Sequence, residues 1–244
     1  YIVLLVLIMA GMLGGMFTYL SLSICEPLSA AGMDWLYFAL MGLIAILLGS
    51  FGSVFNTYSG LYLAKDNDLL LSMPIPVGVI MTARLLVVYI MGLLYSGVVI
   101  IPAAAVYLIK VSAAVGSVIG SFMSVLLISV FVLTLSCILG WVVAKISLKL
   151  KNKSVITVFV SIMFLAAYYF VYFKAQSLIS ELIANAAVYG EKIKGSAYPI
   201  YLAGKAGTGD PAALAIVTAV VIALFALMWV LISRSFLKTA TSAG

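Results

Sequence analysis

Long apolar runs alternate with short polar connectors along the whole chain. Six runs have twenty residues or more, enough for an α-helix to cross the roughly 30 Å hydrocarbon core of a membrane. They cover residues 1–24, 35–58, 77–109, 111–144, 154–173 and 211–232. The pattern predicts an all-α transmembrane fold of six membrane-spanning helices, in a single transmembrane domain over residues 1–244. We expect a break at Pro102, and a tight hairpin at Lys110 and Ser112 between the third and fourth runs.

Basic residues set the orientation of these helices. Four lysines crowd the short loop before the fifth run: Lys145, Lys149, Lys151 and Lys153. Short loops rich in Lys and Arg stay in the cytoplasm, so this loop is predicted to lie inside. Alternation from that loop puts both termini, Lys65 and Arg84 inside, and it puts Glu26, Asp34 and Lys110 outside.

The longest polar connector, residues 174–211, falls outside in this topology. Apolar residues recur at helical spacing over residues 178–187, and Gly190 follows as a candidate helix C-cap. We therefore predict an extracytoplasmic amphipathic helix on the outer leaflet. The glycine-rich residues 204–209 lack the spacing of a phosphate loop, since Ala206 stands where Ser or Thr must follow Lys205. They predict a turn before a last helix that begins at Pro211.

Composition agrees with a membrane protein and removes several classes of function. The chain is 66% hydrophobic and 8% charged, far from the values of soluble domains. Its net charge of +6 is scattered over the helix ends, without the basic and aromatic clusters of a nucleic-acid site. The chain has no histidine, and its acidic residues lie almost entirely in connectors. We therefore predict no catalytic residues, no metal site and no cofactor, and Cys25 and Cys137 as packing residues without a disulfide.

Two glycine pairs have the spacing that lets membrane helices approach closely. These are Gly11 with Gly15, and Gly116 with Gly120. Packing within the chain is the favoured interpretation of both. A dimer interface and a substrate path remain alternatives.

Residues 61–76, after the second run, do not fit a simple cytoplasmic loop. Water would leave four apolar side chains exposed there: Leu69, Leu70, Leu71 and Met73. Four polar residues precede them: Lys65, Asp66, Asn67 and Asp68. We predict a cytoplasmic elbow that ends at Pro74 and Pro76, with a helix break near Asp66. It either lies in the membrane interface or docks to a cytosolic partner, and Arg84, two helical turns beyond Pro76, is either an interfacial anchor or a functional partner.

This elbow resembles the cytoplasmic signature of the type 2 ABC exporter permeases of Gram-positive bacteria. It reads Ala64-Lys65-Asp66-Asn67-Asp68-Leu69-Leu70-Leu71-Ser72-Met73-Pro74-Ile75-Pro76, and Arg84-Leu85-Leu86 follows. Residues 198–210, before the last run, are also similar to that family. The resemblance implies ATPase coupling through Lys65, Asp66, Asn67, Asp68, Leu69, Leu70, Leu71, Met73 and Arg84.

The resemblance implies a permease subunit in a bacterial plasma membrane. It would export a hydrophobic or amphipathic substrate, while a separate cytosolic ABC ATPase subunit hydrolyses ATP. The other expected partners are the lipid bilayer and a second six-helix half or a homodimer or heterodimer mate. Family members are often twice as long, so a first half of a longer permease is one expectation, and the first helix is expected to continue upstream of Tyr1.

Two other classes of function stay open. A self-sufficient channel or secondary transporter normally needs ionisable residues inside its spans, and here the spans are nearly empty of them. The third class is a membrane-embedded enzyme or a passive assembly scaffold. The missing histidine and paired acids disfavour the enzyme but not the scaffold.

Overall fold

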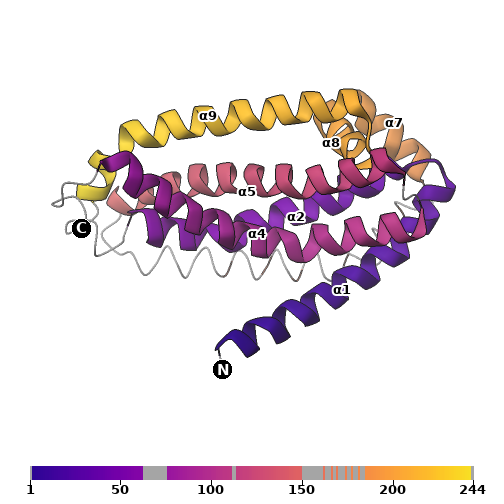
Figure 1. Ribbon diagram of the computed structural model, residues 1–244, viewed down its shortest axis with the longest axis horizontal. Coiled ribbons are helices and arrows are strands. Elements are labelled where there is room, and N and C mark those ends of the chain that lie inside the picture. The colour runs from indigo at the N-terminus through magenta and orange to yellow at the C-terminus, as the bar shows by residue number, and fades with distance from the viewer. Residues whose placement is uncertain are drawn as a thin grey trace.

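The computed structural model describes residues 2–62, 76–111, 114–149 and 185–242, together with six single residues between 162 and 181. Within this part every regular element is a helix, which confirms the predicted all-α class (Figure 1). The elements are α1 (Ile2–Ala30), α2 (Asp34–Thr57), the π-helical turn η1 (Tyr58–Tyr62), α4 (Val77–Lys110), α5 (Val115–Lys149), α7 (Ala186–Ser196), α8 (Tyr198–Thr208) and α9 (Pro211–Ser242).

Four of these helices are long and apolar enough to cross a membrane. The candidate spans are Asp34–Leu61, Gly78–Lys110, Val115–Lys145 and Pro211–Ser233. They match the second, third, fourth and sixth predicted spans, and the chain is a multi-pass membrane protein. In α1 the side chains are described only from Gly11 onward. The fifth predicted span, 154–173, lies outside the described residues except for Ile162, Ala166 and Tyr169, so it stays a prediction.

Two features of the helices differ from the prediction. Glu26 and Pro27, expected in a connector, belong to α1, which continues to Ala30. The connector shortens to residues 31–33 because Gly32, with a φ of 68°, turns the chain sharply. Pro102 does not break its helix, since α4 runs through it to Lys110. Membrane helices tolerate an internal proline because neighbouring helices and local adjustments satisfy the freed backbone groups.

The connector before the last helix is also more ordered than predicted. Gly190 does not end a helix but lies within α7, where an added side chain would meet Met33 and Trp35. Most of the predicted amphipathic stretch, residues 178–187, lies outside the described part. Residues 204–208 are not a turn, because α8 continues to Thr208, and only Gly209 adopts the left-handed conformation of a C-cap. The prediction that the last helix begins at Pro211 is confirmed.

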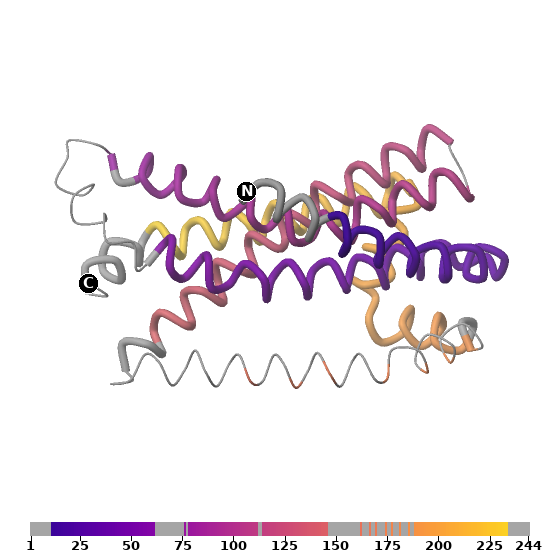
Figure 2. The backbone as a smooth tube through the Cα atoms, turned by 90° about the horizontal axis from the view of Figure 1, so that it is seen from below, coloured from indigo at the N-terminus to yellow at the C-terminus, as the bar shows by residue number. Residues whose placement is uncertain are grey.

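Helices α2, α4, α5 and α9 run along the length of the molecule, and its two ends differ (Figure 1). Helices α7 and α8 lie at the end where α1 meets α2 and α4 meets α5, in both views (Figure 1 and Figure 2). We call this the α8 end. At the opposite end lie the end of α2, the start of α4 and the C-terminus, and we call it the η1 end. Each end has its own cluster of buried apolar residues, and Cys25 and Cys137 are buried and not disulfide-bonded, as predicted.

Glycine lets α8 press directly against α2. A Cβ atom at Gly204 would overlap the backbone carbonyl of Trp35, and one at Gly207 would overlap the ring of Phe38. A carbon at Gly120 would lie 2.5 Å from the backbone of Gly209. The pair Gly116 and Gly120 therefore packs within the chain, as predicted. By contrast, a Cβ atom added at Gly11 or at Gly15 would have no neighbour within 4 Å among the described residues.

Replacement of Gly209 by alanine tests how much the fold depends on this contact. Gly209 has a φ of 96°, and its Cβ would also collide with the carbonyl of Gly116. Left-handed strain costs about 1–2 kcal/mol, and overpacking adds roughly 1–3 kcal/mol. Gly32→Ala is the matched control, because Gly32 also has a positive φ but nothing within 4 Å. In reversible unfolding by SDS in mixed micelles, Gly209→Ala should lose clearly more stability than Gly32→Ala, and equal losses would contradict the packing.

Candidate functional site

Of the nine residues predicted to couple the chain to an ATPase, the structure describes one. Eight lie outside the described residues: Lys65, Asp66, Asn67, Asp68, Leu69, Leu70, Leu71 and Met73. Their role stays a prediction. Arg84 is described, and it lies half-buried near the start of α4.

Arg84 ties α4 to the end of α2. Its Nη1 donates a hydrogen bond of 2.5 Å to the carbonyl oxygen of Gly60, in the π-helical turn that continues α2. The last carbonyls of a helix have no partner within it and carry the negative end of the helix dipole, so a guanidinium binds there favourably. The Nε and Nη2 atoms of Arg84 are also buried. Arg84 is thus a buried anchor at the η1 end, rather than a side chain that extends along the surface to water.

Apolar packing reinforces this anchor. Leu61, one residue beyond Gly60, is completely buried. It packs in one cluster with Met81 and Leu85 of α4 and with Met228 of α9. The chain therefore enters the predicted elbow from a point that is fixed against two other helices.

At the α8 end, an ion pair joins α1 to α4. The Nζ of Lys110 lies 2.9 Å from Oε1 of Glu26. The alternation of spans predicted that both residues lie outside the membrane on the same side, and the structure brings them together. Both side chains are exposed, so the pair adds little to stability.

Asp210 fixes the turn between α8 and α9. Its Oδ1 accepts hydrogen bonds from the backbone N–H groups of Ala212 and Ala213, at 3.1 and 3.0 Å, and caps α9. Its Oδ2 lies 2.8 Å from the Nζ of Lys205 in α8. The hydrogen bond with Lys205 is the main cause that lowers the pKa of Asp210, and the hydrogen bond from the Ala213 N–H lowers it further. The hydrogen bond between Lys205 and Asp210 also raises the pKa of Lys205.

Aromatic rings and lysines gather beside this turn. The rings of Trp35 and Tyr201 meet edge to face with centroids 4.8 Å apart. The Nζ of Lys194 lies 5.8 Å from the Trp35 centroid and 5.4 Å from that of Tyr201. Tyrosine, tryptophan and lysine are typical of the level at which membrane helices meet the lipid headgroups. Such residues gather here at the α8 end, where the candidate spans Asp34–Leu61 and Pro211–Ser233 begin.

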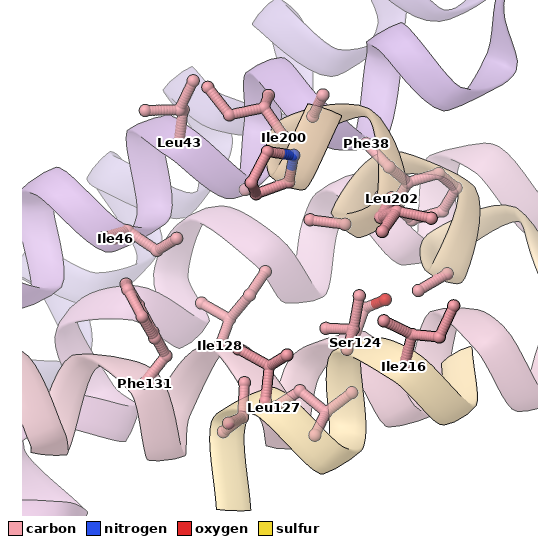
Figure 3. Close-up of a pocket in the computed structure, with 18 residues that line it drawn as sticks. Phe38, Leu43, Ile46, Ser124, Leu127, Ile128, Phe131, Ile200, Leu202 and Ile216 are labelled. Atoms are coloured by element: carbon pink, nitrogen blue, oxygen red, sulfur yellow. The ribbon is translucent and has the colours of Figure 1, made fainter. Parts of the chain in front are cut away.

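An apolar cavity of about 430 Å³ opens beneath α8 (Figure 3). Four helices line it: α2, α5, α8 and α9. Ser124 of α5 is the one lining residue with a polar side chain, and Phe38, Leu127 and Ile216 are typical of the rest. Among the described residues its lining holds no ionisable side chain, and such an apolar cavity suits an apolar group.

No pattern in the sequence predicts this cavity. Its lining comes from positions as distant as Ala39 and Val220, and each is an unremarkable apolar residue within a span. No spacing or motif marks the set. The small residues Gly42, Ala203 and Ala206 leave room there, but sequence alone cannot tell a small residue at a cavity from one at a close helix contact.

Comparisons with protein-family models, with curated proteins and with solved structures found no match. The resemblance to ABC exporter permeases therefore rests on the residues quoted above.

Replacement of Asp210 by alanine should loosen the α8–α9 turn. Loss of an N-cap costs about 0.5–2 kcal/mol. Asp210→Asn is the matched variant, because it keeps an oxygen for the N–H groups of Ala212 and Ala213 but loses the charge facing Lys205. We expect Asp210→Asn to lose less stability than Asp210→Ala in the same unfolding measurement at pH 7.

The pH dependence follows from the lowered pKa of Asp210. Its ionised form is favoured in the folded state, so the stabilisation is complete above the ordinary value of 3.8 and is lost as the pH falls through the lower folded-state pKa. The stability difference between wild type and Asp210→Asn should therefore shrink below pH 4. A difference that stayed constant down to pH 2 would contradict an ionic contribution from Asp210.

Proposed function

We propose that the chain is the permease subunit of an ATP-driven exporter of the type 2 ABC class, with six spans and both termini in the cytoplasm. The observation that carries the proposal is the anchor between Arg84 and Gly60. It lies where α2 leads into the elbow whose sequence resembles the ATPase-coupling segment of that family. In this proposal the elbow faces a cytosolic ATPase, and a second six-helix half or a dimer mate completes the transporter.

The anchor supplies a route for mechanical coupling. A force on the elbow would act first on Gly60 and Leu61, because these are the last well-packed residues before it. The hydrogen bond to Arg84 would pass that force to α4, and the packing of Leu61 against Met228 would pass it to α9. Helices move as rigid units, so such a displacement at the η1 end would reach the α8 end.

The charge distribution favours this function over an ion-coupled transporter. In the four described spans, Arg84 is the one charged side chain that does not lie at an end of its span. Ion-coupled transporters use ionisable groups near the midplane to bind or relay their ions. An ATP-driven exporter for a hydrophobic or amphipathic substrate needs none. Proton- or sodium-dependent flux in liposomes without ATP would favour the self-sufficient transporter instead.

Substitution of the elbow carboxylates tests the coupling directly. We expect the double variant Asp66→Ala with Asp68→Ala to insert into the membrane normally. Roughly thirtyfold more of this variant than of the wild-type chain should be needed for half-maximal stimulation of the ATPase, since loss of a central interface residue costs about 2 kcal/mol. The measurement is ATP hydrolysis by the purified ATPase, titrated with the chain in nanodiscs.

The control for that titration is Glu191→Ala. Glu191 is an exposed carboxylate on α7, at the α8 end, so its loss removes a charge far from the elbow. It should leave stimulation unchanged. Unchanged stimulation in the elbow variant, or an equal loss in the control, would refute the docking role.

Substitution of Arg84 separates coupling from folding. Arg84→Lys keeps the positive charge but loses the planar fork of donors, and Arg84→Gln loses the charge. A charged hydrogen bond contributes about 1.5–3 kcal/mol, so we expect Arg84→Gln to be clearly less stable and Arg84→Lys to lie between it and wild type. If Arg84 transmits force, Arg84→Lys should bind the ATPase with unchanged affinity but reach a lower maximal stimulation. If a destabilised Arg84→Lys variant still reached the wild-type maximal stimulation of the ATPase, Arg84 would stabilise the fold without transmitting force.

A further inference from the structure

The apolar cavity beneath α8 is elongated along the helices that enclose it. On α5 its lining runs over residues 124–131, and on α2 over residues 38–46. At 1.5 Å per residue these stretches are about 10–12 Å long. The residues nearest the α8 end are Phe38 and Ser124, and those farthest from it are Ile46 and Phe131 (Figure 3). The cavity therefore extends from the surface level of α8 toward the middle of the bundle.

Ser124 is a largely buried residue whose hydroxyl makes no hydrogen bond within the described part of the chain. Its side chain lines the cavity, and only 6% of the residue is exposed. Deeper along α5, Ser129 donates to the carbonyl of Val125 at 2.8 Å, and Ser136 donates to that of Val132 at 2.7 Å. No such bond forms at Ser124. Its hydroxyl is open to the cavity, so it is available to donate a hydrogen bond to a ligand there.

Positive charge lies at the same end as this hydroxyl. Lys205 sits on α8 directly before Ala206, which lines the cavity, but its charge is balanced by Asp210. Lys194 of α7 contacts the rings of Trp35 and Tyr201 and makes no ion pair with a described residue. An anionic group at this level would therefore face an available lysine, beside rings that favour the headgroup region.

The geometry points to a bound phospholipid at this site. One acyl chain fills the cavity from Ser124 to Phe131, an ester carbonyl accepts the hydrogen bond of Ser124, and the phosphate lies at the α8 end near Lys194. The volume of about 430 Å³ falls within the range of roughly 300–1,000 Å³ that small-molecule sites occupy. Such a lipid would join α8 and α9 to the bundle. The proposal does not depend on an ATPase partner.

The occupant can be identified with a photoreactive lipid. The chain is purified, stripped of lipid in detergent and incubated with a phospholipid that carries a diazirine halfway along one acyl chain. After irradiation, mass spectrometry locates the adducts. We expect them on peptides that contain residues 127–131 of α5 and 216–221 of α9.

Two tryptophan variants of α9 provide a matched pair. Val220 lines the cavity, whereas Val230 does not, and both are about half exposed. Val220→Trp should lower the cavity adducts at least about tenfold, since it places a large ring where the acyl chain lies. Val230→Trp should leave them unchanged. Equal adduct yields in the two variants would overturn the proposal.

Replacement of Ser124 by alanine tests the polar contact without filling the cavity. Loss of one neutral hydrogen bond should weaken lipid binding about two- to tenfold, measured by competition with the unlabelled phospholipid. Ser129→Ala is the control, because that hydroxyl bonds within its own helix. Adducts spread evenly over exposed faces such as Leu86 and Val87 of α4 would overturn the proposal. So would cross-links showing that residues 154–173 or a second copy fill the cavity. Neither result bears on ATPase stimulation, so the two proposals fail separately.

Discussion

The close approach of α8 to α2 and α5 is the contact on which the architecture of the α8 end depends. It requires glycine at each point of contact, because Gly204, Gly207 and Gly120 face backbone or ring atoms at distances that exclude a Cβ. In a membrane, helices associate through such packing rather than through the hydrophobic effect, since lipid is as apolar as they are. With α8 in this position, Asp210 caps α9, and the cavity opens beneath α8.

Different contacts stabilise the two ends of the bundle. At the α8 end, backbones touch, and the ion pair of Glu26 with Lys110 lies at the surface. At the η1 end, a buried guanidinium binds the carbonyl of Gly60 at the end of α2. A charge inside a membrane protein is costly and is retained where it serves a purpose. In the proposed exporter, a force would enter at the η1 end and would change the packing around the cavity at the α8 end.

The length of the apolar runs was enough to predict α2, α4, α5 and α9, because spanning a membrane imposes one strict requirement on each segment. Where small residues decide the outcome, that reasoning failed. The glycines of residues 204–208 predict a turn, although here they allow close packing inside α8. Pro102 and Pro27 were expected outside regular helix, but membrane helices accommodate them. The cavity could not be predicted from the sequence, because four separate segments line it. Ser124 differs from the other serines of the spans only in its surroundings in the folded chain.

The most direct measurement is the side of the membrane on which each end lies. Both native cysteines are buried, so single cysteines can be introduced against a low background. Glu191→Cys on α7 reports the α8 end, and Lys65→Cys reports the predicted elbow. With a membrane-impermeant maleimide, the account predicts that Glu191→Cys is labelled in intact cells and that Lys65→Cys is labelled only after permeabilisation. Labelling of Lys65→Cys in intact cells would contradict it, because the elbow would then be out of reach of a cytosolic ATPase.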